Sequence, residues 1–341
     1  MNAVDKLIEF FSPASALCRR AARSALAYYE AAEPSRLRKF YKSRGSANEM
    51  VQRGAIAVRA QARHLARNHD LARGALRVLV NNVVGPNGIG IEPQPRRTDG
   101  TIHSEYAEAL REAWRDWCRY PEVTHRLPWP RLQRAMARAW LRDGEVFAQL
   151  ITGNRADLNH KTKVPFSLEA FEADLVPLDL NDPGKNIIQG IERNTWGQPL
   201  AIHVLKTDPT SVSLPTTGQT KRISWDRAIH LATFDHIGQV RGVSEFAAVI
   251  TRLEDIKDYE ESERVAAKIA AMLTAYVKKG TPDLYQPNEN SNEPRQLSMQ
   301  PGMIIDDLAP GEEVDMIDSN RPNPNLITFR QGQLRAIAAG L

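Results

Sequence analysis

The chain has 341 residues, of which 42% are hydrophobic and 25% are charged, which is enough for two or three units with their own cores. Its two cysteines, Cys18 and Cys118, show no paired spacing, which argues against a disulfide scaffold or a cysteine-ligated metal site. No apolar run approaches the roughly 20 residues needed to span a bilayer. The scarcity of cysteines fits a reducing, cytoplasmic origin, and Asp5 and Glu9 interrupt the N-terminal apolar run and spoil it as a signal peptide.

The net charge of +4 conceals an asymmetry between the two halves of the chain. Residues 1–155 hold 26 Lys and Arg against 15 Asp and Glu, whereas 156–341 hold 19 against 26. A basic half is typical of a surface that meets DNA, anionic lipid or an acidic partner. Solvated arginine-rich helices would give the same composition, and no aromatic residues are interleaved among the arginines, so both interpretations stay open.

The N-terminal half is predicted to be helical after a basic, irregular arm at 1–45, in which Pro34 separates two arginine clusters. A helix is expected over 48–83, with apolar contacts from leucines and valines. Its arginines four residues apart share one face: Arg59, Arg63 and Arg67. The following Gly85-Pro-Asn-Gly-Ile-Gly90 segment is interpreted as a helix end and turn.

Two shorter helices are expected next, at 104–118 and 129–143. The second has Pro130 near its first turn and Asp143-Gly144 at its end. From Glu145 the periodicity changes to short β-like runs at 145–151, 166–172, 187–193, 200–206 and 227–233. Turn sequences separate these runs, which predicts a mostly antiparallel β unit and an α+β fold class.

One long amphipathic helix is predicted from Ser244 to Lys279, about 54 Å long at roughly 1.5 Å per residue. Its apolar residues recur every three or four positions with charged residues between them. A single apolar stripe on a charged rod suits packing against copies of the same chain. The predicted interface residues are Phe246, Ile250, Leu253, Ile256, Ile269 and Leu273.

The segment 280–325 is acidic, with nine acids against two arginines, and short strands are expected at 303–305 and 313–317. Such a segment should repel DNA and suit protein partners, although a solvated loop between two helices would look the same. A last helix begins near Leu326 and stops at Leu341, and this is interpreted as a truncated or partial chain.

No motif predicts catalysis, a metal or a cofactor. The glycines at 85–90 do not follow a strand, as a dinucleotide fingerprint requires, and the chain has no G-x-x-x-x-G-K-[ST] sequence. Gly242-Val-Ser244-Glu-Phe246 lacks the second glycine of a nucleophile elbow, so Ser244 is better interpreted as a helix N-cap.

The titratable residues give no catalytic constellation either. His203 and His230 are interpreted as half-buried strand residues. The carboxylate pairs Asp143/Glu145 and Asp306/Asp307 are interpreted as solvated, because solvated carboxylates outnumber metal ligands.

Several segments, in order, resemble the lambda-type portal proteins of tailed bacteriophages. They cover roughly residues 50–341 and include Arg63-His-Leu-Ala-Arg-Asn68, Asn82-Val-Val-Gly85, Trp114-Arg-Asp-Trp117, Arg142-Asp-Gly-Glu-Val-Phe147, Leu168-Glu-Ala-Phe-Glu-Ala-Asp174, Ile188-Gln-Gly-Ile-Glu192, Ala201-Ile-His-Val204, Ile229-His-Leu231, Gly238-Gln-Val-Arg-Gly-Val-Ser244, Gln300-Pro-Gly302 and Leu308-Ala-Pro-Gly-Glu312.

The resemblance implies a non-enzymatic subunit of a ring, typically dodecameric, at one capsid vertex, through which double-stranded DNA enters and leaves. It implies a wing of helices and antiparallel strands at 46–240, a stem helix at 241–279, a clip at 280–325 and a returning stem helix starting at 326–341, while the basic arm at 1–45 matches less clearly. Relatives continue through a tunnel loop, a channel-lining helix and a crown, so the fold is expected to be C-terminally incomplete.

The resemblance also implies partners and a location. The partners are further copies of the chain, the terminase large subunit, the major capsid protein, and head-completion or tail-connector proteins, with no membrane. The chain is expected in the virion and, during assembly, in the host cytoplasm. Arg330 and Arg335 are candidate DNA contacts, and Glu312 and Glu313 are candidate terminase contacts. A basic nucleic-acid-binding accessory protein and a metal-dependent nuclease remain alternatives.

Overall fold

The computed structural model describes residues 45–207, 219–271, 275–279, 312–316 and 325–341. The chain separates into two compact units, Met1–Ser46 and Ala47–Leu341, and the fold described below is that of the second. The predicted basic arm and the predicted strand at 303–305 lie outside the described residues, apart from Gly45.

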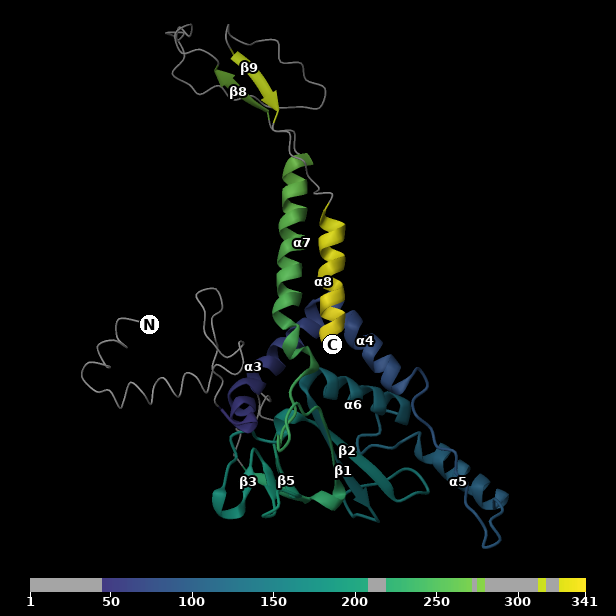
Figure 1. Cartoon of the computed structure of the whole chain (residues 1–341). Helices are drawn as coiled ribbons and strands as arrows, with labels where there is room; N and C mark the ends of the chain where they lie inside the picture. The colour runs from purple at the N-terminus through teal and green to yellow at the C-terminus, as the bar shows by residue number, and fades with distance from the viewer. Residues whose placement is uncertain (1–44, 208–218, 272–274, 280–311, 317–324) are drawn as a thin grey trace, which may run out of the picture. The chain divides into compact units, whose positions relative to one another are not determined.

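Four helices form the first part of this unit: α3 (Ala47–Asn68), α4 (Asp70–Val84), α5 (Ser104–Trp117) and α6 (Trp129–Asp143) (Figure 1). The helix predicted over 48–83 is thus two helices, because His69 takes an extended conformation between them. His69 Nε2 lies 2.9 Å from the carbonyl oxygen of Leu253, which ties this break to a helix far along the chain. Gly85 ends α4 with a φ of 77°, as expected for a helix end.

Two antiparallel sheets follow. The first has the order β2-β1-β7, from β1 (Glu145–Thr152), β2 (Phe166–Glu172) and β7 (Ala228–Ala232). The second has the order β3-β4-β5-β6, from β3 (Ile187–Ile188), β4 (Ile191–Arg193), β5 (Pro199–Leu205) and β6 (Thr220–Ser224). The predicted antiparallel unit is confirmed.

Strand β1 lies between two layers. Val146 and Ala148 pack with Met136 of α6 and with other residues of α5, α6 and β2 in one core. Phe147, which points to the opposite face, packs with Ile202 of β5 and its neighbours in a second core. Because successive side chains of a strand alternate between its faces, one apolar run serves both cores. The layers are therefore helices, the three-stranded sheet and the four-stranded sheet.

A third core is helical and joins α3, α4 and α6 to α7 (Ile250–Ala271) and α8 (Leu326–Gly340). Figure 1 shows α7 and α8 side by side, and Tyr259 of α7 packs against Phe329 of α8 with ring centroids 4.9 Å apart. Leu76 of α4, Leu253 of α7 and Ile337 of α8 meet in this core. The predicted last helix, from Leu326, is confirmed.

The long helix predicted over 244–279 is shorter than expected. Ser244 accepts from the Phe246 amide, but it caps a 3-10 turn, η5 (Glu245–Ala248), and α7 then ends at Ala271. Its 22 residues span about 33 Å at roughly 1.5 Å each. The end of the predicted helix is instead β8 (Ala275–Lys279), whose Tyr-Val pair favours a strand. It pairs with β9 (Glu312–Met316), which confirms the strand predicted at 313–317.

The apolar stripe of α7 packs within the chain itself, which corrects the predicted intersubunit surface. Phe246, Ile250, Leu253 and Ile256 are each at most 4% exposed, because α3, α4, α6 and α8 cover them. They therefore offer no surface to a neighbouring copy in this fold. The side chains of Ile269 and Leu273 lie outside the described residues, so their role remains a prediction.

Candidate functional site

Buried charges gather where α6 ends and β1 begins. Gly144 closes α6 in a left-handed conformation with a φ of 91°, and Asp143 and Glu145 stand on either side of it. Residues from α3, α6, β1, β2, η2 (Ala173–Leu175), β7 and the segment before η5 converge here. We call this the buried charge cluster; its members are Arg59, Arg63, Arg142, Asp143, Glu145, Glu172, Asp174, His230 and Arg241.

Glu145 is the centre of the cluster and has no exposed surface. Its Oε1 accepts from Arg59 Nη2 at 3.1 Å and from Arg241 Nη2 at 2.7 Å. Its Oε2 lies 3.0 Å from His230 Nε2 and accepts from the Gly242 amide at 3.0 Å. Both oxygens are therefore occupied by donors from four different segments.

Arg241 matches Glu145 in burial and is fully satisfied on its other side. Its Nη1 donates to the carbonyl oxygens of Val176 at 3.0 Å and Gln189 at 2.7 Å, and its Nη2 donates to that of Ala173 at 3.2 Å. The guanidinium also lies over the ring of Phe147. Arg241 thus joins β1 to the segments before and after β3, and it precedes the helix α7 by nine residues in sequence.

The ion pairs set the charge state of Glu145. Burial alone would raise the pKa of this carboxyl, but the charge of Arg241 and the hydrogen bond with His230 outweigh it and hold the pKa far below its usual range. Glu145 is therefore a fixed anion at neutral pH. A carboxylate in this state neither donates a proton nor has a free oxygen for a ligand.

The outer part of the cluster is built around Asp143, which is 2% exposed. Arg63 Nη2 donates to Asp143 Oδ2 at 2.8 Å and Arg142 Nε to Oδ1 at 2.7 Å. The same two arginines reach Glu172, and Arg63 also pairs with Asp174. Burial opposes the charged form of Arg63, but Asp143 and Asp174 raise its pKa above the usual value.

The cluster is balanced, with four arginines against four carboxylates. Breaking a buried ion pair by removing one partner costs about 3–5 kcal/mol, because a charge is left buried and unpaired. No group of three or more His, Cys, Asp or Glu side chains able to hold a metal occurs among the described residues. The arrangement locks five or more segments together, and its chemistry is that of a structural joint.

Backbone contact completes the joint. A Cβ atom on Gly242 would lie 2.1 Å from the Gly144 carbonyl oxygen, and one on Gly144 would lie 2.3 Å from the Val243 carbonyl carbon. The backbone of the Gly144 segment and that of the Gly242 segment can come this close only because neither residue has a Cβ atom. Ser244 Oγ then donates to the Arg142 carbonyl oxygen at 2.6 Å, so the segment that leads into η5 and α7 is attached directly to the end of α6.

Sequence reasoning missed this site, because it interpreted Asp143 and Glu145 as solvated. The structure corrects that interpretation for both residues; Asp306 and Asp307 lie outside the described residues. The available signal was the pair Arg59 and Arg63, one helical turn apart on a helix that also carries the apolar core face. His203 and His230 are partly buried as expected, but His230 serves the cluster.

The other predicted site residues are scattered. Arg330 on α8 pairs with Glu260 of α7 within the chain, and Arg335 is exposed on the same helix. Glu312 and Glu313 lie on β9 in register with Lys279 and Lys278 of β8. None of the helices within the described ranges is both long enough and apolar enough to cross a membrane.

Comparison with known proteins gives a consistent result. A family model described as phage portal protein, lambda family, matches residues 33–341. A probable portal protein of the Halomonas phage phiHAP-1 is 24% identical over 311 residues, which cover 86% of this chain and 58% of the relative. The chain thus spans little more than half of that relative's length.

Two solved structures match over most of the chain at low identity. The neck of an empty GTA particle computed with C6 symmetry is 12% identical, with 84% of this chain and 68% of that chain covered and a TM-score of 0.48. The neck of a native GTA particle computed with C12 symmetry is 13% identical, with 84% and 72% covered and a TM-score of 0.45.

Proposed function

Because this chain belongs to the lambda family of phage portal proteins, we propose that it is a subunit of the ring at one capsid vertex through which double-stranded DNA enters and leaves. The observation that carries the proposal is the antiparallel pair α7 and α8, whose ends pack in the helical core. The segment that leads into α7 is attached to the two-sheet body at the buried charge cluster. A ring subunit needs such a rigid connection, since every copy must hold its rod at the same angle.

The finer assignments follow the family scheme. We assign the wing to residues 46–240, the stem to α7 with α8, and the clip to 280–325. The stem of this chain is therefore shorter than the segment 241–279 predicted from the sequence, because β8 begins at Ala275. The number of copies is proposed to be twelve.

The proposed partners are the terminase large subunit, the major capsid protein, head-completion or tail-connector proteins, and DNA in the channel. Glu312 and Glu313 are proposed as terminase contacts, and Arg330 and Arg335 as DNA contacts. The pairing of Arg330 with Glu260 weakens its candidacy, because its charge is already compensated. The portal family is structural, and we propose that this chain has no catalytic turnover and acts in the virion.

Measurement of particle mass in solution tests the proposal. Purified chain should form a large ring, seen as one high-mass species by mass photometry and as annular particles by electron microscopy. An accessory nucleic-acid-binding protein would instead stay small and bind duplex DNA with a steep salt dependence. A nuclease would cleave duplex DNA in the presence of Mg²⁺, and either result would overturn the portal assignment.

A further inference from the structure

One face of α7 is rich in acids, with Lys257 beside them. Glu254, Asp258 and Glu261 follow the four- and three-residue spacing of a single helical stripe, and Asp255 lies beside it. All four side chains are exposed. Within the part of the chain that the structure describes, none of them takes part in an ion pair or hydrogen bond. We call these four residues the acidic face.

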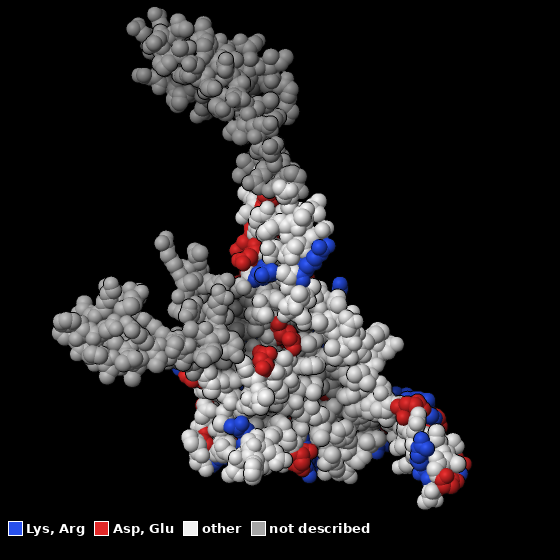
Figure 2. All heavy atoms as spheres, viewed as in Figure 1, with Lys and Arg blue, Asp and Glu red and all other residues white. Residues whose placement is uncertain are grey.

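The acidic face points away from both neighbours of α7. Leu253 and Ile256 turn toward the helical core, whereas Glu260 and Tyr259 contact Arg330 and Phe329 of α8. At 100° per residue Glu254, Asp258 and Glu261 lie roughly 80–160° around the helix from these contacts, whereas Asp255 lies one turn below Tyr259. Figure 2 shows acidic side chains along the edge of α7 away from α8. The face is therefore open to a partner.

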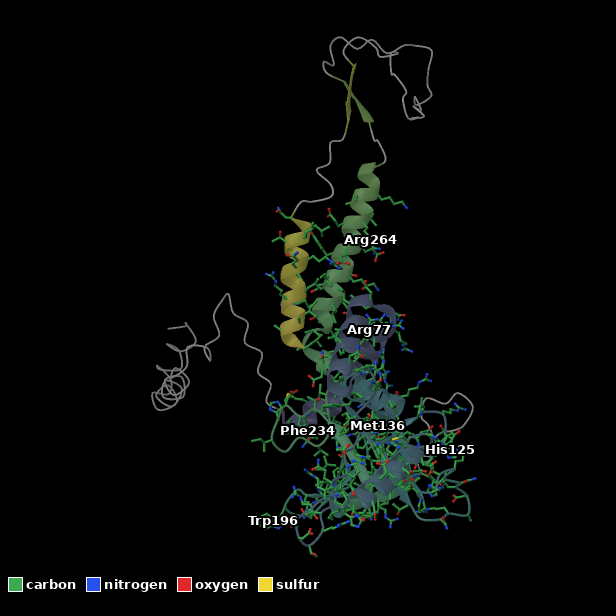
Figure 3. The ribbon with its side chains drawn as sticks, turned by 90° about the vertical axis from the view of Figure 1, so that its right-hand side faces the viewer. Arg77, His125, Met136, Trp196, Phe234 and Arg264 are labelled. Carbon is green, nitrogen blue, oxygen red and sulfur yellow. The ribbon has the colours of Figure 1, made fainter. Side chains whose placement is uncertain are left out.

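A matching set of unpaired cations lies on α4 and α8. Arg73, Arg77 and Arg335 are exposed, and among the described residues none of them pairs with a carboxylate. Arg335 stands 200° around α8 from Ile337, which packs in the helical core, so its side of α8 faces outward. Figure 3 labels Arg77 on α4. We call these three residues the cationic face.

The surroundings of the cationic face add to its positive charge. Arg138 of α6 lies close enough to Arg73 and Arg142 that burial and the two neighbouring charges lower its pKa. Cations that repel one another within a chain are stabilised by an anion from outside it. A partner that binds this face would therefore be acidic.

Arg335 lies at the same level along the helix pair as part of the acidic face. Arg330 meets Glu260, and ten residues later Gly340 lies against Val249, so α7 and α8 run antiparallel in this register. Arg335, halfway between, is level with Glu254 and Asp255. A rotation about an axis along the helix pair keeps every residue at its own level. Neighbouring copies in a ring would therefore bring Arg335 of one beside the acids of the next.

We propose that the acidic face of α7 in one copy docks on the cationic face of α4 and α8 in the next copy. This inference rests on the proposed ring function and names its subunit contact. The contact joins two different faces, so it is heterologous, and repeating it around an axis closes a ring. A second copy is favoured over DNA because the same chain supplies both charges at matching levels, whereas DNA would leave the acidic face unpaired.

Two charge-reversed variants and their mixture test the contact. Variant one is Glu254→Lys with Asp258→Lys, and variant two is Arg77→Glu with Arg335→Glu. Each alone presents like charges at the contact, so the concentration for half assembly should rise about tenfold or more. Mixed in equal amounts, the first variant's reversed acidic face meets the second's reversed cationic face, and rings of alternating subunits should form again. Mass photometry of each variant and of the mixture measures this.

Recovery in the mixture also shows that both variants are folded, and their thermal melts check this independently. Glu105→Lys with Glu112→Lys on α5 changes the net charge as much as variant one does and should leave assembly unchanged. If both variants assemble as the unmodified chain does, the contact is overturned although the portal assignment stands. If variant two still forms rings but binds a fluorescent DNA duplex more weakly, the cationic face is a DNA surface. An unmodified chain that never forms rings overturns the proposed function itself.

Discussion

Glu145 shows how a fully buried carboxylate remains charged: Arg59, Arg241, His230 and a backbone amide occupy its oxygens. Replacement by Gln keeps the shape but leaves Arg241 buried without an anion. Glu145→Gln should lower the free energy of unfolding by about 3–5 kcal/mol, measured by urea denaturation. Glu49→Gln breaks the exposed pair with Arg53 and should cost under about 1 kcal/mol. Equal losses for both variants would contradict the role given to the cluster.

The cluster also predicts how stability depends on pH. Burial opposes ionisation of Glu145 and Asp174, but their arginine partners lower the pKa of both carboxyls below the usual range. The unfolded chain therefore binds protons first as the pH falls, starting near the ordinary Glu pKa of 4.5. The stabilisation is fully present above that value and is lost progressively below it.

Urea denaturation from pH 7 to pH 3 measures this dependence. The free energy of unfolding should fall as the pH drops below about 4.5, and Glu145→Gln should reduce the slope, because one linked carboxyl is gone. An unchanged slope in that variant would show that Glu145 titrates alike in the folded and unfolded chains.

At the scale of elements, the crossing of Gly144 and Gly242 fixes how the β unit is joined to α7. Gly242→Ala would place a Cβ 2.1 Å from the Gly144 carbonyl oxygen, and both partners are backbone, which cannot move aside easily. We expect a loss of about 2–4 kcal/mol in unfolding free energy. Gly54→Ala is the matched control, since nothing lies within 4 Å of its added Cβ in α3. That change should stabilise the chain by about 0.5–1 kcal/mol.

The apolar stripe of α7 gives a second prediction for this scale. Leu253 is 1% exposed in the helical core, so Leu253→Ala should cost about 2–5 kcal/mol whatever the protein concentration. Val265→Ala, on the exposed side of α7, should change stability by less than about 0.5 kcal/mol. A loss at Leu253 that appears only on dilution would instead assign the stripe to an intersubunit contact.

Most elements could be predicted because their periodicity is local. Helix α6, with Pro130 near its start and Gly144 at its end, and strand β2 match their predicted bounds. Strand β6, Thr-Lys-Arg-Ile-Ser, has one apolar residue and no alternation, and only pairing with β5 makes it a strand. The break at His69 likewise depends on a contact with Leu253, which local sequence does not reveal.

At the scale of the whole molecule, the buried charge cluster could not be predicted because its partners are far apart in sequence. Asp143 and Glu145 look solvated beside a helix end, and only the fold brings Arg59 and Arg241 to them. Family membership was predictable, because many short segments that each resemble the family only weakly occur in the same order as in the family. The proposed subunit contact depends on which helix faces remain exposed in the folded chain. Periodicity in the sequence could not show this, and it led to the apolar stripe of α7, which the fold buries.

The acidic segment at 280–325 gives a prediction at this scale. Glu312→Lys with Glu313→Lys should slow association with the terminase of the same phage and alter its salt dependence, because charge governs encounter rate more than affinity. Stopped-flow association across a salt series measures this, and particle mass should not change. Identical rate constants at every salt concentration would remove the docking role from these residues.

The residues of the buried charge cluster are synthesised at different times. During synthesis Arg59 emerges long before Arg241, and at about 5–20 residues per second the delay is on the order of ten seconds or more. Late in this interval Glu145 still lacks Arg241, although Arg59 and its acidic partners have already been made. We therefore expect the end of α6 and the start of β1 to become fixed only when the segment that leads into α7, and carries Arg241, has been made.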